Sequence, residues 1–336
     1  MKRITMVDIA RLANVDVSTV SRAMSGSPLV TAETTDRIMK IVSETGYIVN
    51  RNARGLRKSR SSRVLMILPN ITNPSVPEIV LGAEEVLREN GFSLNIGISQ
   101  YDQDREETLA QQVVSGEVDG ALILTGRIPD RILCLPSYEQ RVVALSRRVL
   151  DPTVVNVTVD NFEAARQMTR HLLELGHRKI AHFAGPLDNP TFKARAQGYS
   201  NAMEEAGLPD EIRILSTSNK FNLEAGRYLM EKLLAEGCGS AVVAAMDEMA
   251  IGATQVIRAA GMDIPRDMSV SGIGDLPLSE SLEPPLSTVR VPRREMGQRA
   301  AKHLIALLEG KQVELDDVLY PIPVFRRSTS RSTSSH

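Results

Sequence analysis

Residues 6–24 of the chain, MVDIARLANVDVSTVSRAM, decide how its N-terminal end folds. Thr5 stands directly before this stretch and can cap a first helix. The inner face of that helix would carry the apolar residues Ile9, Leu12 and Ala13. Asp16 can cap a second helix after a short turn. The stretch therefore predicts two short helices joined tightly.

A third helix is expected further along, because Thr31 can cap it and Gly46 can end it. Its apolar stripe would be Ile38, Ile41 and Val42. Two helices joined by a tight turn, with a third helix packed on them, are typical of a helix-turn-helix domain. The pattern predicts an all-α DNA-binding domain over residues 1–49. A plain three-helix bundle, whose hydroxyl groups serve only as caps, is the alternative.

In a helix-turn-helix domain the second helix enters the major groove of DNA. Arg22 could bind a guanine through O6 and N7, and Val17 could touch a thymine methyl group. Ser18 could donate or accept a hydrogen bond at a base edge. Five hydroxyl side chains are placed to contact phosphates, which fix the register of the protein on DNA: Thr5, Thr19, Ser21, Thr31 and Thr34.

The distribution of charge supports a nucleic-acid contact at this end. The formal net charge of all 336 residues is −1. Residues 1–63 hold 12 Lys and Arg against 5 Asp and Glu, a net charge of +7, and the remainder holds 28 against 36, a net charge of −8. A basic end on an acidic body indicates contact with an anionic partner. A merely solvated basic end is the alternative.

After residue 62, short apolar strands alternate with amphipathic helices. The expected strands are 64–68, 94–98, 120–124 and 142–145, followed by 179–183, 213–215, 241–245 and 269–272. Continuous apolar strands between helices are typical of parallel sheets covered on both faces. The expected fold is α/β, with two doubly wound subdomains. A helix over 294–308 and the segment 319–325 are expected to return to the first subdomain.

Residues 6–24, together with the stretch GYIVNRNAR over residues 46–54, resemble the lac/gal repressor (LacI/GalR) family. The resemblance continues to about Arg327. It implies a periplasmic-binding-protein-like core, with one subdomain over 63–161 plus 291–325 and the other over 162–290. It also implies a ligand-controlled transcriptional regulator that binds a pseudo-palindromic operator as a homodimer.

The family resemblance assigns residues 50–62 to a hinge that becomes helical on DNA. Asn50, Ala53 and Leu56 recur every three residues and would share the face that meets the bases in the minor groove. The leucine would wedge a base step apart, as apolar side chains do in the minor groove. A flexible basic linker is the alternative for the free protein.

Ligands of open α/β sheets bind outside the carboxyl ends of the strands. The residues there that match effector-contacting positions of the family are Asn73, Ser146, Asp160, Asn189, Thr191, Arg195, Phe221 and Asp247. Arg127, Arg147, Lys193 and Asp275 are further candidates, and Asn70, Arg148 and Asn161 occupy the same kind of position. Each of them could instead be only a cap or a turn former.

Two departures from the family affect the choice of ligand. Ser75 and Val76 stand where members often carry aromatic residues, and Gly274 stands where sugar-binding members often carry an aspartate. Four basic candidates, Arg127, Arg147, Lys193 and Arg195, favour a carboxylate or phosphate. We therefore expect a sugar acid such as gluconate, with a neutral sugar or a nucleoside as the alternative.

The sequence argues against several other classes of protein. Cys134 and Cys238 form no disulfide framework, and neither they nor the five histidines have a metal-ligand spacing. The absence of a nucleophile elbow or a phosphate loop argues against an enzyme, and we expect no cofactor. No signal peptide or membrane span is present in this sequence, so we expect a cytoplasmic protein rather than a transporter's solute-binding protein. Residues 326–336, rich in Ser, Thr and Arg, are expected to be disordered.

Overall fold

A computed structural model describes residues 4–24, 27–47, 61–218, 220–237 and 239–332. The chain forms two compact units, Met1–Ser61 and Ser62–His336. The predicted hinge contacts Asn50, Ala53 and Leu56 lie outside the described residues. Within the described part, no helix is both long and apolar enough to cross a membrane.

The first unit contains the three predicted helices, α1 (Met6–Leu12), α2 (Val17–Ala23) and α3 (Ala32–Thr45). Thr5, Asp16 and Thr31 cap them as expected, and Gly46 ends α3 in the left-handed conformation. The core of this unit is small and consists of Ile9, Ala10, Ala13, Val20, Ala23 and Ile38. The prediction that Leu12 faces inward was wrong, because this side chain is 56% exposed and Ala10 takes the inner position.

The second unit is built on two parallel sheets. The six-stranded sheet has the order β11-β5-β4-β3-β1-β2. Its strands are β1 (Arg63–Leu68), β2 (Ser93–Ile98), β3 (Gly120–Ile123), β4 (Val142–Leu145), β5 (Val155–Val159) and β11 (Asp316–Leu319). The four-stranded sheet has the order β7-β6-β8-β9, with β6 (Ile180–Ala184), β7 (Arg213–Ser216), β8 (Ala241–Ala244) and β9 (Ser269–Ser271).

Helices cover both faces of each sheet, as the apolar strands predict. Along β1, Val64, Met66 and Leu68 pack with α5 (Val76–Glu89) and α13 (Arg293–Leu308). Leu65 and Ile67 point the other way, toward α6 (Gln103–Val114) and α7 (Asp130–Leu133). The four-stranded sheet lies among α8 (Asn161–Glu174), α9 (Pro190–Glu205), α10 (Leu223–Ala235) and α11 (Asp247–Ala259), and α12 (Pro277–Ser281) follows β9.

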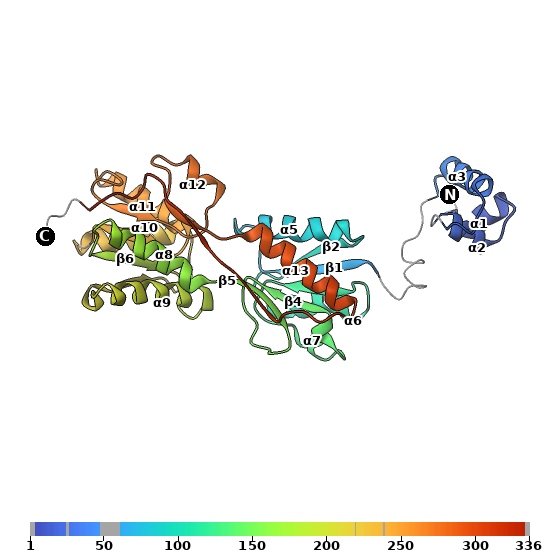
Figure 1. Ribbon diagram of the computed structural model, residues 1–336, viewed down its shortest axis with the longest axis horizontal. Coiled ribbons are helices and arrows are strands. Elements are labelled where there is room, and N and C mark those ends of the chain that lie inside the picture. The colour runs from blue at the N-terminus through green and yellow to red at the C-terminus, as the bar shows by residue number, and fades with distance from the viewer. Residues whose placement is uncertain (1–3, 25–26, 48–60, 219, 238, 333–336) are drawn as a thin grey trace. The chain divides into compact units, whose positions relative to one another are not determined.

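The chain passes between the two sheets more than once (Figure 1). It leaves the first sheet after β5 and returns after β10 (Thr288–Arg290), and α13 then packs against α5. The expected return of the last helix is therefore confirmed. β11 joins the edge of the first sheet, but β12 (Ile322–Val324) pairs antiparallel with β10 instead.

Two glycines allow helices α5 and α13 to pack closely. A Cβ atom on Gly82 would lie 2.0 Å from the Arg294 carbonyl oxygen, and one on Gly297 would lie 2.0 Å from the Ile79 carbonyl oxygen. Any side chain at either position would push the two helices apart.

The prediction of a disordered tail was wrong for residues 326–332. Ser328 is 2% exposed, and its hydroxyl group donates to the Val270 carbonyl oxygen at 2.6 Å. The Ser287 amide donates to the same hydroxyl oxygen at 2.7 Å. Composition gave a false signal here, because small hydroxyl side chains can satisfy buried backbone groups as well as remain in water. Residues 333–336 lie outside the described part.

Candidate functional site

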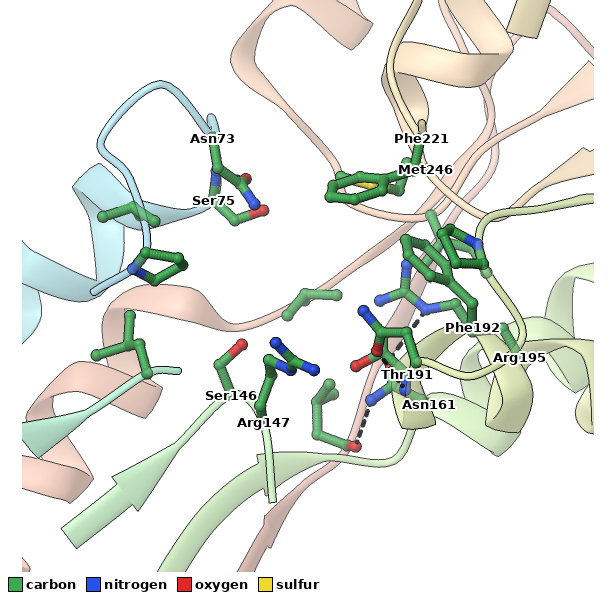
Figure 2. Close-up of a pocket in the computed structure, with 18 of the residues that line it drawn as sticks. Asn73, Ser75, Ser146, Arg147, Asn161, Thr191, Phe192, Arg195, Phe221 and Met246 are labelled. Atoms are coloured by element: carbon green, nitrogen blue, oxygen red, sulfur yellow. Dashed lines mark hydrogen bonds between the residues drawn. The ribbon is translucent and has the colours of Figure 1, made fainter. Parts of the chain in front are cut away.

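A cavity of about 560 Å³ lies at the carboxyl ends of strands from both sheets. Asn73 and Ser75 come from the loop after β1, and Ser146 and Arg147 follow β4. Asn189 comes directly before α9, and Thr191 lies in the first turn of that helix. Met246 follows β8 (Figure 2). The volume is in the range of sites that hold small molecules.

Seven of the twelve predicted ligand residues line this cavity: Asn73, Ser146, Arg147, Asn189, Thr191, Arg195 and Phe221. Asn161, at the start of α8, lines it too. Arg293 and the apolar residues Phe192 and Met246 also line the cavity and were not predicted from the sequence. Arg293 comes shortly after β10, a strand of three residues that is too short to give a clear sequence signal, so its position after a strand could not be recognised.

Arg195 is buried at the wall of the cavity, with 7% of its surface exposed. Its Nε donates to Asn161 Oδ1 at 2.9 Å, and its Nη1 donates to the Ala245 carbonyl oxygen. The pKa of Arg195 is lowered to about 9, mainly by burial and to a smaller extent by neighbouring Arg293, while Asp247 opposes the shift. At neutral pH the cavity therefore contains a desolvated guanidinium group, which an anionic ligand would stabilise.

Arg293 is fixed by the loop after β9. Its Nη1 donates to the Gly274 carbonyl oxygen at 2.6 Å. Burial lowers the pKa of Arg293, and the Asp247 carboxylate partly offsets that effect. The side chain thus adds a second cation to the lining.

Arg147 adds a third cation, on the side of the first sheet. Its Nε is buried and has no hydrogen-bond partner among the described residues. The preceding residue, Ser146, has a φ of +67°, and the Arg147 amide donates to the Leu145 carbonyl oxygen at 2.8 Å across it. Such a tight, strained turn persists only where the surroundings hold it, and it sets both side chains at the cavity (Figure 2).

In contrast to the basic residues, another part of the cavity lining is apolar and aromatic. The rings of Phe192 and Phe221 lie 5.2 Å apart between centroids, tilted by 48°. Figure 2 shows Met246 beside Phe221. These side chains offer an apolar surface to the carbon skeleton of a ligand.

The side-chain amides of Asn189 and Asn73 already accept hydrogen bonds from nearby backbone groups. Asn189 Oδ1 accepts from the Thr191 amide at 3.0 Å and caps α9, and Asn73 Oδ1 accepts from the Ser75 amide at 2.9 Å. Their side-chain nitrogens have no partner among the described residues and remain available as donors. Asn70 lies outside the lining and accepts from the Asn73 amide at 3.0 Å.

Five predicted ligand residues do not line the cavity: Arg127, Asp160, Lys193, Asp247 and Asp275. Arg127 instead meets three carboxylates, with its Nη2 2.8 Å from Glu107 and its Nη1 3.3 Å from Asp130, and Glu106 beside Nε. Lys193 is exposed on α9, and Asp160 caps α8 by accepting from the Glu163 amide at 2.8 Å. The capping alternative considered for these positions holds for Asp160.

Asp247 and Asp275 have structural partners. Asp247 is 1% exposed, and its Oδ2 accepts from the Leu276 amide at 2.8 Å and from Ser279 at 2.7 Å. Its Oδ1 accepts from Thr288 at 2.5 Å. Asp275 pairs at 2.7 Å with Arg290 on β10 and at 2.7 Å with Arg326 beyond β12, so it joins the two antiparallel crossing strands.

His182 and His177 make structural contacts. His182 is fully buried against Tyr199, its Nδ1 lies 2.9 Å from the Val243 carbonyl oxygen, and burial lowers its pKa to about 4. His177 bridges Ser240 and the Ser330 carbonyl oxygen. Among the described residues no group of three or more His, Cys, Asp or Glu side chains could hold a metal ion.

In the first unit, the predicted base contacts have different surroundings. Arg22 is exposed near the end of α2, and Ser18 is half-buried. Val17 is half-buried against the small core, so less of its side chain is available to a thymine than expected. Among the predicted phosphate contacts, Thr5 and Thr31 accept from backbone amides as helix caps, and Thr31 donates to Thr34 at 2.9 Å. Thr19 and Ser21 are half-buried on α2.

Comparison with known proteins decides the family. Residues 5–50 match the family "Bacterial regulatory proteins, lacI family", and residues 169–329 match "Periplasmic binding protein-like domain". The HTH-type transcriptional repressor CytR of Escherichia coli (strain K12) is 30% identical over 333 residues, which cover 98% of this chain and 96% of that protein. The chain belongs to the LacI family.

Solved structures agree with this LacI-family assignment. The transcriptional regulator CelR in complex with cellobiose matches with a TM-score of 0.71 at 31% identity, covering 97% of this chain and 100% of that one. A lac repressor dimer bound to operator and an anti-inducer matches with a TM-score of 0.87, covering 98% of this chain and 100% of that one, at 24% identity. The second match supports the fold alone. This LacI-family chain is a DNA-binding transcriptional regulator with a helix-turn-helix head and a periplasmic-binding-protein-like core.

Proposed function

We propose that this LacI-family protein is a cytoplasmic repressor of carbohydrate catabolic genes, and that a sugar acid bound in the cavity controls its affinity for an operator. The observation that carries the choice of effector is the set of three arginines in the lining: Arg147, Arg195 and Arg293. Within the described lining the one carboxylate is Asp188, which is exposed. A ligand with a carboxylate would neutralise buried positive charge, and a neutral ligand would leave it unpaired.

The rest of the lining suits a polyhydroxylated chain. Ser146 and Thr191 have hydroxyl groups, and Asn73, Asn161 and Asn189 contribute amides. The aromatic side of the cavity would pack against the carbon skeleton. A gluconate-like acid combines all three features in one small molecule.

DNA binding is assigned to the first unit. In this proposal α2 enters the major groove, where exposed Arg22 reads a guanine and Ser18 approaches a base edge. Five hydroxyl side chains contribute phosphate contacts near the helix ends: Thr5, Thr19, Ser21, Thr31 and Thr34. Two copies of the chain would present two heads to a pseudo-palindromic operator, because the symmetry of a dimer is shared by its DNA site.

The crossing segments would connect the cavity to the hinge. Ligand contacts from both sheets can change the angle between those sheets, since only a few segments link them. In the proposal this change alters how the hinge residues 50–62 become helical on DNA, and Leu56 then enters the minor groove only in one state of the core.

Calorimetry and DNA selection test the proposal together. Purified full-length protein should retain pseudo-palindromic duplexes from a random pool, and it should bind D-gluconate more tightly than D-glucose. Binding of a nucleoside alone would exclude the sugar-acid effector, and retention of DNA without sequence preference would exclude operator recognition.

A neutral sugar is the second candidate effector, because the similar regulator CelR was solved in complex with cellobiose. The same calorimetric series distinguishes the two. A neutral-sugar effector predicts heats of binding for glucose or a disaccharide and none for gluconate.

A further inference from the structure

The charge of the cavity exceeds what one carboxylate can neutralise. Arg147, Arg195 and Arg293 line it, and the buried carboxylate of Asp247, outside the lining, influences both Arg195 and Arg293. His182 adds no charge at neutral pH, because burial lowers its pKa to about 4. Within the described lining these three cations meet one carboxylate, that of exposed Asp188, so the lining carries a formal excess of two positive charges, while Asp247 lies outside it.

The basic side chains come from elements on two sides of the cavity. Arg147 follows β4 of the six-stranded sheet, and Arg195 stands on α9 beside the four-stranded sheet. Figure 2 shows Arg147 next to Ser146 and Arg195 on the side of Thr191 and Phe192. A single carboxylate at Arg195 and Arg293 would therefore leave Arg147 to be matched by another group.

Arg147 has the features of a group that awaits a ligand. Its Nε is buried without a partner, and no hydrogen bond or ion pair joins its guanidinium group to the described residues. The matched contrast is Arg148, the next residue, which is exposed, lies outside the lining and pairs with Asp316 at 2.7 Å. A buried donor without a partner is costly unless a ligand satisfies it.

We propose that the effector is a sugar-derived dianion with an acidic group at each end of a hydroxylated chain, one for Arg147 and one for Arg195 with Arg293. The hydroxyl and amide groups of Ser146, Asn161 and Thr191 would then face the hydroxyl groups between the two ends. This inference rests on the proposed sugar-acid effector and specifies its charge and the position of that charge.

Calorimetry of the full chain at constant ionic strength provides the test, with four ligands that differ in charge. D-glucarate carries a carboxylate at each end, D-gluconate carries one, D-glucose 6-phosphate carries its negative charge at one end, and D-glucose carries none. We expect D-glucarate to bind about tenfold or more tightly than D-gluconate, the effect of one additional charge-assisted hydrogen-bonded contact.

Two variants of adjacent arginines locate the second anionic group. Arg147→Gln should weaken D-glucarate binding about tenfold or more and change D-gluconate binding far less, so that the two dissociation constants converge. Arg148→Gln should leave both constants unchanged. Since the Arg147 side chain has no polar partner among the described residues, its replacement removes no protein hydrogen bond, and the variant should fold.

The outcomes separate this inference from the broader proposal. If D-gluconate binds and D-glucarate binds no more tightly, or if Arg147→Gln weakens both ligands equally, the two-ended dianion is wrong and the sugar-acid effector stands. Tighter binding of D-glucose 6-phosphate than of D-glucarate would also overturn it. If D-glucose alone binds, both the inference and the sugar-acid effector are wrong.

Discussion

Replacing Arg195 with alanine should separate ligand binding from folding. The side chain donates through Nε to Asn161 and through Nη1 to the Ala245 carbonyl oxygen, and Nη2 has no partner among the described residues. A charge-assisted hydrogen bond from that nitrogen to a carboxylate is worth about 1.5–3 kcal/mol, so Arg195→Ala should weaken D-gluconate binding roughly 10- to 150-fold. Isothermal titration calorimetry measures this change.

The same variant should also lose stability. Truncation leaves Asn161 Oδ1 and the Ala245 carbonyl oxygen without a donor in a buried region, at a cost of about 1–3 kcal/mol for each group. Urea denaturation should therefore show a lower free energy of unfolding.

Arg166→Ala is a matched control for this effect. Arg166, on α8, bonds to Asn201, Glu163 and Glu205 but does not line the cavity. The control should reduce stability and leave the affinity for D-gluconate unchanged. An Arg195→Ala protein that bound D-gluconate as tightly as the wild type would refute the role given to this arginine.

Four further perturbations test other parts of the molecule. Arg22→Ala should weaken operator binding by about 1–3 kcal/mol and relax selectivity at one base pair, which DNA selection with the variant would reveal. Leu56→Ala should weaken specific binding but leave salt-dependent nonspecific binding intact, and equal operator affinity in electrophoretic titration would contradict the wedge. Burial lowers the pKa of His182 from 6.5 to about 4, so the unfolded chain binds this proton more readily than the folded core. The contribution of His182 to the free energy of unfolding should therefore be complete above pH 6.5 and fall by up to about 3 kcal/mol as the pH drops toward 4. Urea denaturation at several pH values would measure this loss. Gly297→Ala should cost about 1–3 kcal/mol, because the new methyl group meets the Ile79 carbonyl oxygen, and an unchanged thermal midpoint would contradict the close packing of α5 and α13.

The main helices and strands could be predicted because their signals are local. A helix cap or a run of apolar residues depends only on neighbouring residues in the chain. This holds for the caps Thr5, Asp16 and Thr31 and for the apolar strands β1, β4 and β8. β5 and β10 were missed. Val155–Val159 alternates polar and apolar residues without the continuous apolar run that marked the other buried strands, and β10 is only three residues long.

The cavity lining was only partly predictable, because a strand-end position does not fix where a side chain points. Arg127 and Arg147 both follow strands of the first sheet, yet Arg127 is drawn to Glu106, Glu107 and Asp130 while Arg147 lines the cavity. Such partners come from α6 and α7, and their approach depends on the packing of the whole sheet. Asp247 likewise has three partners later in the chain, two at α12 and one on β10, which no local pattern indicates.

The operator affinity of the full chain, measured with and without a sugar acid, tests directly whether the cavity controls DNA binding. Fluorescence anisotropy on a duplex selected by the protein would give the dissociation constant in the presence of saturating D-gluconate, D-glucarate or D-glucose. A LacI-family regulator controlled by an anionic effector should change its operator affinity by about fivefold or more with an acid, and not with D-glucose. An operator affinity that stayed the same with every acid, or that changed with D-glucose alone, would contradict this control.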